Sequence, residues 1–187
     1  LSPTSLSFAS LADTTTLTAT VKDTGGSTIS GATVTWNSSD TDIATVSSAG
    51  LVTAVGNGTA TITAASGSVS ATATTTVTQV ASSVTLSATS LSFASFADTA
   101  TLAATVNDAN DSTMAGATVV WASSDITITT VSSAGLVTSK ANGTATITAT
   151  SGAGSDTVTV TVTQDANSVT LSPTSLSFAS LADTTTL

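Results

Sequence analysis

Aspartate side chains are the candidates for binding chemistry in this sequence, because every acidic residue is Asp. The densest group of oxygen ligands is Asn107, Asp108, Asn110 and Asp111, within five residues. Hard cations such as Ca²⁺ prefer carboxylate and amide oxygens, so this stretch is a candidate calcium site. The corresponding residues 22–26 carry one carboxylate and a lysine, so the site would not recur. Because Asp also favours turns, the alternative is that these residues only shape a loop.

The inventory of side chains argues against catalysis. General acid–base and nucleophilic catalysis depend mainly on His, Glu, Cys, Tyr or a Lys of shifted pKa. The first four types are absent, and the two cations, Lys22 and Lys140, stand at different places relative to the internal repeat of the chain. We therefore expect no enzyme activity and, apart from the calcium hypothesis, no cofactor.

The chain is built from an internal repeat. Residues 1–85 and 86–170 are identical at 59 of 85 positions, and residues 171–187 repeat residues 1–17 without a difference. Repeat arrays grow by adding copies of one packed unit. We expect one domain at residues 1–80, with its first strand truncated at its start, and a second at 84–165. Residues 169–187 would then open a third repeat or the next polymer unit.

Charge and hydropathy limit the partners. The net charge is −9 with only two cations, so the chain lacks the basic surface that a phosphate backbone requires. Nucleic acid is therefore excluded as a natural partner. No run approaches the roughly 18 apolar residues of a membrane-spanning helix, so we expect no membrane span in this segment.

Alternation of aliphatic and hydroxyl side chains predicts strands and argues against a disordered, Ser/Thr-rich stalk. The period is two in five runs, at residues 16–21, 33–36, 59–64, 101–106 and 157–163. This is the period of a strand with one buried face, and no helical stripe accompanies it. Turn signals separate the runs, so the pattern predicts an all-β fold of tandem β-sandwiches with seven or eight strands each.

Two tryptophans stand at the ends of alternating runs. By parity, Trp36 and Trp121 lie on the same faces as neighbouring valines, so we expect both rings to be core residues. The alternative is an exposed ring that stacks on a sugar. Phe8 and Phe93 are also predicted core residues.

Thr occupies every second position of the last two predicted strands in each repeat, at residues 59–63 and 72–78 in the first and at 144–150 and 157–163 in the second. If these runs pair as a hairpin, each unit carries an uncharged Thr-rich outer face. Thr is also simply a good polar strand former, and ice binding, lateral contact between filaments and O-glycosylation remain alternatives. The residues of this predicted face are Thr59, Thr61, Thr63, Thr72, Thr74, Thr76, Thr78, Thr144, Thr146, Thr148, Thr150, Thr157, Thr159, Thr161 and Thr163.

Each repeat resembles the group 2 bacterial immunoglobulin-like domain over its whole length. The most specific motifs are Trp-x-Ser-Ser-Asp at residues 36–40 and 121–125, and Gly-Leu-Val-Thr at 50–53 and 135–138. The resemblance implies tandem Ig-like sandwiches that extend bacterial surface and secreted proteins, including adhesins of the intimin and invasin kind. It implies no fixed catalytic residues.

We therefore predict a structural building block of an extracellular or cell-surface bacterial fibre, filament or adhesin stalk. Its partners would be copies of itself along the fibre, with lateral contact as a further option. The alternative function is an adhesive module that recognises a host receptor or glycan. A third reading is that chains join noncovalently, with residues 171–187 completing a neighbouring subunit by strand addition.

Overall fold

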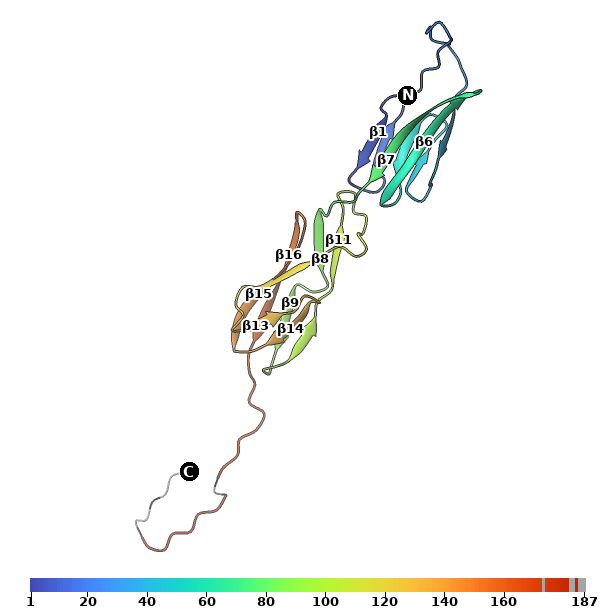
Figure 1. The fold of residues 1–187 in the computed structure, drawn as a ribbon. Coiled ribbons are helices and arrows are strands. Elements are labelled where there is room, and N and C mark those ends of the chain that lie inside the picture. The colour runs from blue at the N-terminus through green and yellow to red at the C-terminus, as the bar shows by residue number, and fades with distance from the viewer. Residues whose placement is uncertain (173, 182–183, 185–187) are drawn as a thin grey trace.

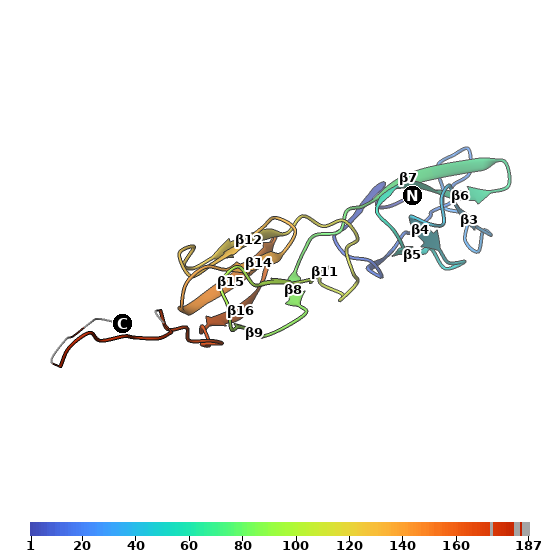
Figure 2. The same ribbon diagram turned by 90° about the horizontal axis from the view of Figure 1, so that it is seen from below.

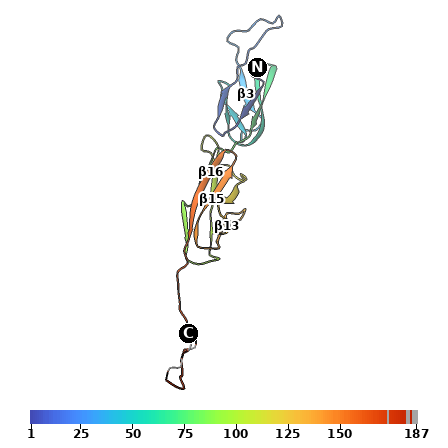
Figure 3. The same ribbon diagram turned by 90° about the vertical axis from the view of Figure 1, so that its left-hand side faces the viewer.

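The computed structural model describes residues 1–172, 174–181 and 184. Within them the chain forms two β-sandwiches that lie end to end, as three views agree (Figures 1, 2 and 3). Every regular secondary-structure element among the described residues is a β-strand, so the predicted all-β class is confirmed. No helix in this part of the chain is long and apolar enough to cross a membrane.

The first sandwich packs a four-stranded sheet, in the order β1-β7-β6-β3, against a three-stranded sheet, in the order β2-β5-β4. The long hairpin of β6 and β7 forms its centre, and β1 joins β7 in parallel. Its strands are β1 (Ser5–Phe8), β2 (Thr14–Thr16), β3 (Thr35–Ser38), β4 (Ala44–Val46), β5 (Leu51–Ala54), β6 (Gly58–Ser66) and β7 (Val69–Val77).

The second sandwich repeats this plan and adds one strand pair. Its sheets have the orders β12-β15-β16-β9 and β10-β14-β13, and β8 pairs with β11. It therefore has nine strands among the described residues, where seven or eight were predicted. Its strands are β8 (Ser83–Leu86), β9 (Ser90–Phe93), β10 (Thr99–Thr101), β11 (Ala104–Asn107), β12 (Val120–Ser123), β13 (Thr129–Val131), β14 (Leu136–Ser139), β15 (Gly143–Ser151) and β16 (Gly154–Val162).

An aliphatic core lies between the two sheets of each sandwich. Val52 and Ile62 are 0% exposed in the first, and so are their equivalents Val137 and Ile147 in the second. Ile62 and Ile147 alternate along their strands with exposed or half-buried Thr, as the period of two predicts. Burial of such side chains is the main favourable contribution to folding.

One predicted strand does not form as expected. Residues 16–21 alternate, but β2 ends at Thr16 and only an isolated bridge, between Thr18 and Ser2, follows. The equivalent residues of the second sandwich include β11, which pairs with β8. A strand needs a hydrogen-bonding partner, and Leu1 is the equivalent of the last residue of β8. Among the described residues, no strand equivalent to β8 pairs with residues 16–21.

Candidate functional site: the joint between the two sandwiches

The connector between the sandwiches, residues 78–82, is hydrogen-bonded on both sides. Thr78 and Val80 donate their backbone N–H groups to carbonyl oxygens of the first sandwich, at 3.0 and 2.9 Å. Ser82 donates its N–H to the carbonyl of Asn107 in the second sandwich, at 2.9 Å. A connector held in this way differs from a flexible Gly/Ser linker, whose backbone is solvated along its length.

Asp108, in the loop after β11, is buried where the two sandwiches meet and is only 1% exposed. Its Oδ2 accepts hydrogen bonds from the backbone N–H of Leu11, at 2.9 Å, and from the side-chain amide of Gln79, at 2.8 Å. Its Oδ1 accepts the N–H groups of Asn110 and Ser112, both at 3.0 Å. One carboxylate therefore fixes its own loop and two segments of the neighbouring sandwich.

These donors control the charge of Asp108. Burial on its own raises the pKa of this carboxyl, but the hydrogen bonds from Gln79 and from three backbone N–H groups outweigh it and hold the pKa below the ordinary value of 3.8. Asp108 is therefore ionised at neutral pH. Hydrogen bonds to an ionised acceptor are stronger than bonds between neutral groups.

Asn110 makes a second connection across the joint. Its Nδ2 donates to the carbonyl of Leu11 at 2.8 Å and to Oδ1 of Asp13 at 2.9 Å. Ala12 lies between these two acceptors and has a φ of 64°, a left-handed backbone conformation that residues other than Gly rarely adopt. The turn at Ala12 thus places both acceptors toward the loop of the second sandwich.

Gln79 is itself held in place by Asn57, in the turn between β5 and β6. The N–H of Gln79 donates to Oδ1 of Asn57 at 2.7 Å, and Nδ2 of Asn57 donates to Oε1 of Gln79 at 3.0 Å. With its oxygen occupied, the Gln79 amide presents its nitrogen to Asp108. Sequence reasoning missed Asn57, Gln79 and Leu11 as parts of this site. The recurrence of the Asn and Gln as Asn142 and Gln164 was the available signal.

The structure brings the residues of the calcium hypothesis together in one loop and shows other uses for them. Both oxygens of Asp108 accept N–H donors, and Asn110 donates to the first sandwich. Asp111 is exposed with a φ of 60°, and Oδ1 of Asn107 is buried without a hydrogen-bond partner. Among the described residues no group of three or more His, Cys, Asp or Glu could hold a metal ion. Calcium binding stays a prediction.

The four aromatic residues predicted to be core residues lie in or against the two cores. Phe8 and Phe93 are buried, whereas Trp36 and Trp121 are half-buried and pack against the cores. A Cβ added at Gly50 would clash with the backbone carbonyl oxygen of Leu17 and would lie 2.9 Å from Cζ2 of Trp36, and the φ of Gly50 is +80°. The close approach of this carbonyl and of the indole, together with the left-handed backbone, explains the glycine of the Gly-Leu-Val-Thr motif.

The predicted Thr-rich face lies on one side of each long hairpin. In the first sandwich Thr61 and Thr63 of β6 stand opposite Thr74 and Thr72 of β7. The second sandwich repeats the arrangement, with Thr146 opposite Thr159 among others. All fifteen residues of the predicted face are exposed or half-buried. Each unit therefore presents a ladder of paired hydroxyls without charge.

Several solved structures are similar to this chain. The structure of domains 4–9 of the surface layer protein SbsC is 27% identical in sequence, with a TM-score of 0.46. The matched region covers 83% of this chain and 26% of the SbsC chain. For domains 1–6 of SbsC the identity is 28% and the TM-score is 0.45, and the match covers 81% of this chain and 23% of the SbsC chain. Invasin, a bacterial integrin-binding protein, is 21% identical, with coverage of 78% and 35% and a TM-score of 0.45. The chain thus spans about a quarter of the SbsC structures.

Comparison with family descriptions gives a match to each sandwich, whereas the search of curated proteins gives none. Residues 1–77 and 80–162 both match the bacterial Ig-like domain (group 2). These ranges correspond to β1–β7 and to β8–β16, so the sequence match and the fold describe the same two units. The chain therefore belongs to the bacterial Ig-like domain (group 2) family, of which it contains two consecutive copies.

Proposed function

We propose that this chain is a structural building block of an extracellular bacterial fibre, filament or adhesin stalk, and that it has no enzyme activity. The observation that carries the proposal is that the connector, residues 78–82, is hydrogen-bonded to both sandwiches. The backbone N–H groups of Thr78, Val80 and Ser82 all donate to backbone carbonyls of the two sandwiches. A joint of this kind restricts the angle between neighbours, so a chain of such units holds its length. Membership of a bacterial Ig-like family supports a location at the cell surface.

The positions of the polar side chains support a function as a spacer. Asp108, Asn110 and Gln79 are used between the two sandwiches, where they fix relative orientation. The outer face of each long hairpin carries paired Thr. In this proposal the partners are further copies of the same unit along the fibre axis.

Electron microscopy of the native material tests this proposal. We expect a fibre or stalk with an axial repeat of one or two sandwiches. A compact globular particle would contradict it. A glycan array with the purified chain separates the spacer from the recognition module: binding to defined glycans at micromolar concentration would favour recognition.

A further inference from the structure

The two sandwiches differ along one edge of their four-stranded sheets. β12 forms this edge in the second sandwich, and its equivalent β3 forms it in the first. Three exposed positions at this edge are polar in the first sandwich and apolar in the second: Thr35, Asn37 and Thr41 correspond to Val120, Ala122 and Ile126. Val120 is 62% exposed and Ile126 is 66% exposed. The edge of the second sandwich thus presents apolar side chains to the outside.

The backbone of β12 is free along one side. Among the described residues, β12 pairs with β15 only. The N–H of Ser124 donates to the carbonyl of Thr146 in β15, at 2.9 Å. N–H and C=O groups of successive strand residues point in opposite directions, so those of Trp121 and Ser123 face away from β15. An unpaired edge of this kind is a template for pairing with another chain.

This edge lacks the residues that usually protect a sheet edge. Lys, Pro and inward-pointing charges are the common means of protection. Between Asp111 and Asp125 the sequence contains no charged residue and no proline. The net charge of the chain is −9, so two copies repel each other over much of their surface. The uncharged edge of β12 is a place where two acidic copies can approach.

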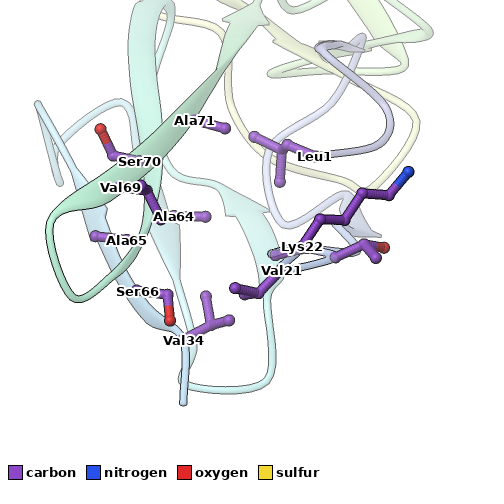
Figure 4. Close-up of a pocket in the computed structure, with 12 residues that line it drawn as sticks. Leu1, Val21, Lys22, Val34, Ala64, Ala65, Ser66, Val69, Ser70 and Ala71 are labelled. Atoms are coloured by element: carbon purple, nitrogen blue, oxygen red, sulfur yellow. The ribbon is translucent and has the colours of Figure 1, made fainter. Parts of the chain in front are cut away.

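An open groove lies beside the free edge. Its volume is about 440 Å³, and its lining is uncharged and includes Val119 and Trp121 together with Leu102. A groove of the first sandwich lies instead beside the turn of the β6–β7 hairpin, where Val69 and the cation Lys22 line it (Figure 4). The groove at β12 therefore leaves room for a strand alongside the edge without placing a charge next to it.

We propose that β12 strands of two copies of this chain pair edge to edge, antiparallel, around a two-fold axis at Trp121. Val120 of each copy then stands opposite Ala122 of the other, so a large side chain meets a small one twice. The two Trp121 residues stand opposite each other, and aromatic pairs across strands are favourable. This inference rests on the proposed fibre function and adds a lateral contact between fibres.

The charges favour the antiparallel orientation, and the repeat favours a second copy as the partner. Asp125 follows β12 directly. A parallel pair would bring the two Asp125 side chains side by side, where like charges are unfavourable, whereas the antiparallel pair places them at opposite ends. A fibre of identical units carries the same edge at regular intervals, so the edge of a neighbouring fibre is present at a high effective concentration.

This pairing places two chains side by side. β15 and β16 run along the long axis of the chain (Figure 3), and β12 is antiparallel to β15. Two copies joined at β12 therefore lie next to each other and run in opposite directions. The pairing involves residues 119–123, fewer than the roughly 20–30 residues on each side of a standard interface, so a single contact is weak. Repetition along a fibre strengthens the association.

Sedimentation velocity of the chain over a series of concentrations tests the proposal. We expect weak dimerisation that Val120→Lys reduces by at least about tenfold, because two like charges would enter an apolar contact. Val120 is mostly exposed, so the variant keeps the fold, and its circular dichroism and melting temperature should not change. The matched control is Thr35→Lys, at the equivalent position of the first sandwich, which should leave dimerisation unchanged.

Disulfide formation tests the register. The chain contains no cysteine, so a mixture of Val120→Cys and Ala122→Cys chains forms only intermolecular disulfides. We expect the mixed dimer to form faster than either homodimer, because positions 120 and 122 of the two copies face each other in a non-hydrogen-bonded pair, where side chains are closest. The control mixture, Thr35→Cys with Asn37→Cys, should show no preference for the mixed dimer.

Three results would overturn the proposal. They are the absence of self-association in the unchanged chain, equal association of Val120→Lys and the unchanged chain, and a mixed disulfide that forms no faster than in the control mixture. Loss of association in Thr35→Lys alone would also overturn it and would assign the contact to β3. Each of these results leaves the spacer function intact, because that function depends on the joint within one chain.

Discussion

The side-chain nitrogen of Gln79 lies 2.8 Å from Oδ2 of Asp108, so the end of the first sandwich and a loop of the second share one buried carboxylate. The second sandwich thereby contributes a hydrogen-bond acceptor to the first, and the first buries a charge of the second. Orientation of the two units and folding of the loop after β11 are therefore linked.

Replacing Asp108 should loosen the joint. Asp108→Ala leaves the N–H of Leu11 and the amide of Gln79 without an acceptor, and each buried unsatisfied donor costs about 1–3 kcal/mol. We expect a lower melting temperature of the second sandwich and a wider range of inter-domain angles in small-angle X-ray scattering. Asp111→Asn, at an exposed neighbour whose φ of 60° Asn also tolerates, is the control and should change neither.

Acid should weaken the same joint. The folded pKa of Asp108 lies below 3.8, so its stabilising effect is complete above pH 3.8 and is lost as the pH falls through the lower folded value. Thermal unfolding measured at several pH values should show this decrease. Asp108→Asn should remove the part of the pH dependence that belongs to the joint; an unchanged profile in this variant would contradict the assignment.

Thr75 offers a gain in stability. Its side chain is 0% exposed, and its hydroxyl has no hydrogen-bond partner. Val160 occupies the equivalent position of the second sandwich and is equally buried. We expect Thr75→Val to stabilise the first sandwich by about 1 kcal/mol and Val160→Thr to destabilise the second by a similar amount, in chemical denaturation. Destabilisation by Thr75→Val would show that the hydroxyl is satisfied in solution.

Gly50 should tolerate no side chain. Gly50→Ala combines a φ of +80° with a Cβ that clashes with the backbone carbonyl oxygen of Leu17 and lies 2.9 Å from Cζ2 of Trp36, and we expect a loss of about 3 kcal/mol in the free energy of unfolding. Gly67→Ala is the matched control, since its φ is +57° and nothing lies within 4 Å of the added Cβ. This control should lose about 1 kcal/mol. Equal losses in the two variants would exclude close packing around Gly50 as the reason for this glycine.

The period of two was enough to predict the sandwiches and the two sides of each hairpin, because full burial of Ile62 and partial exposure of Thr61 depend on parity alone. It was not enough for residues 16–21, where a strand also requires a partner. The hydrogen bonds across the joint could not be read from the sequence, since Leu11 and Asp108 are 97 residues apart and meet only after both sandwiches have folded. The oxygen-rich residues around Asp108 favoured a cation site, whereas two of the four hydrogen-bond donors to its carboxylate, Leu11 and Gln79, come from the neighbouring unit.

The central claim is that the joint holds the two sandwiches at one orientation, and a distance distribution between them tests it most directly. The chain contains no cysteine, so Ser68→Cys and Lys140→Cys give one spin label on each sandwich. Pulsed electron paramagnetic resonance should show a single narrow distribution, which broadens when Asp108→Ala is added. A broad distribution in the chain with an intact Asp108 would contradict the account.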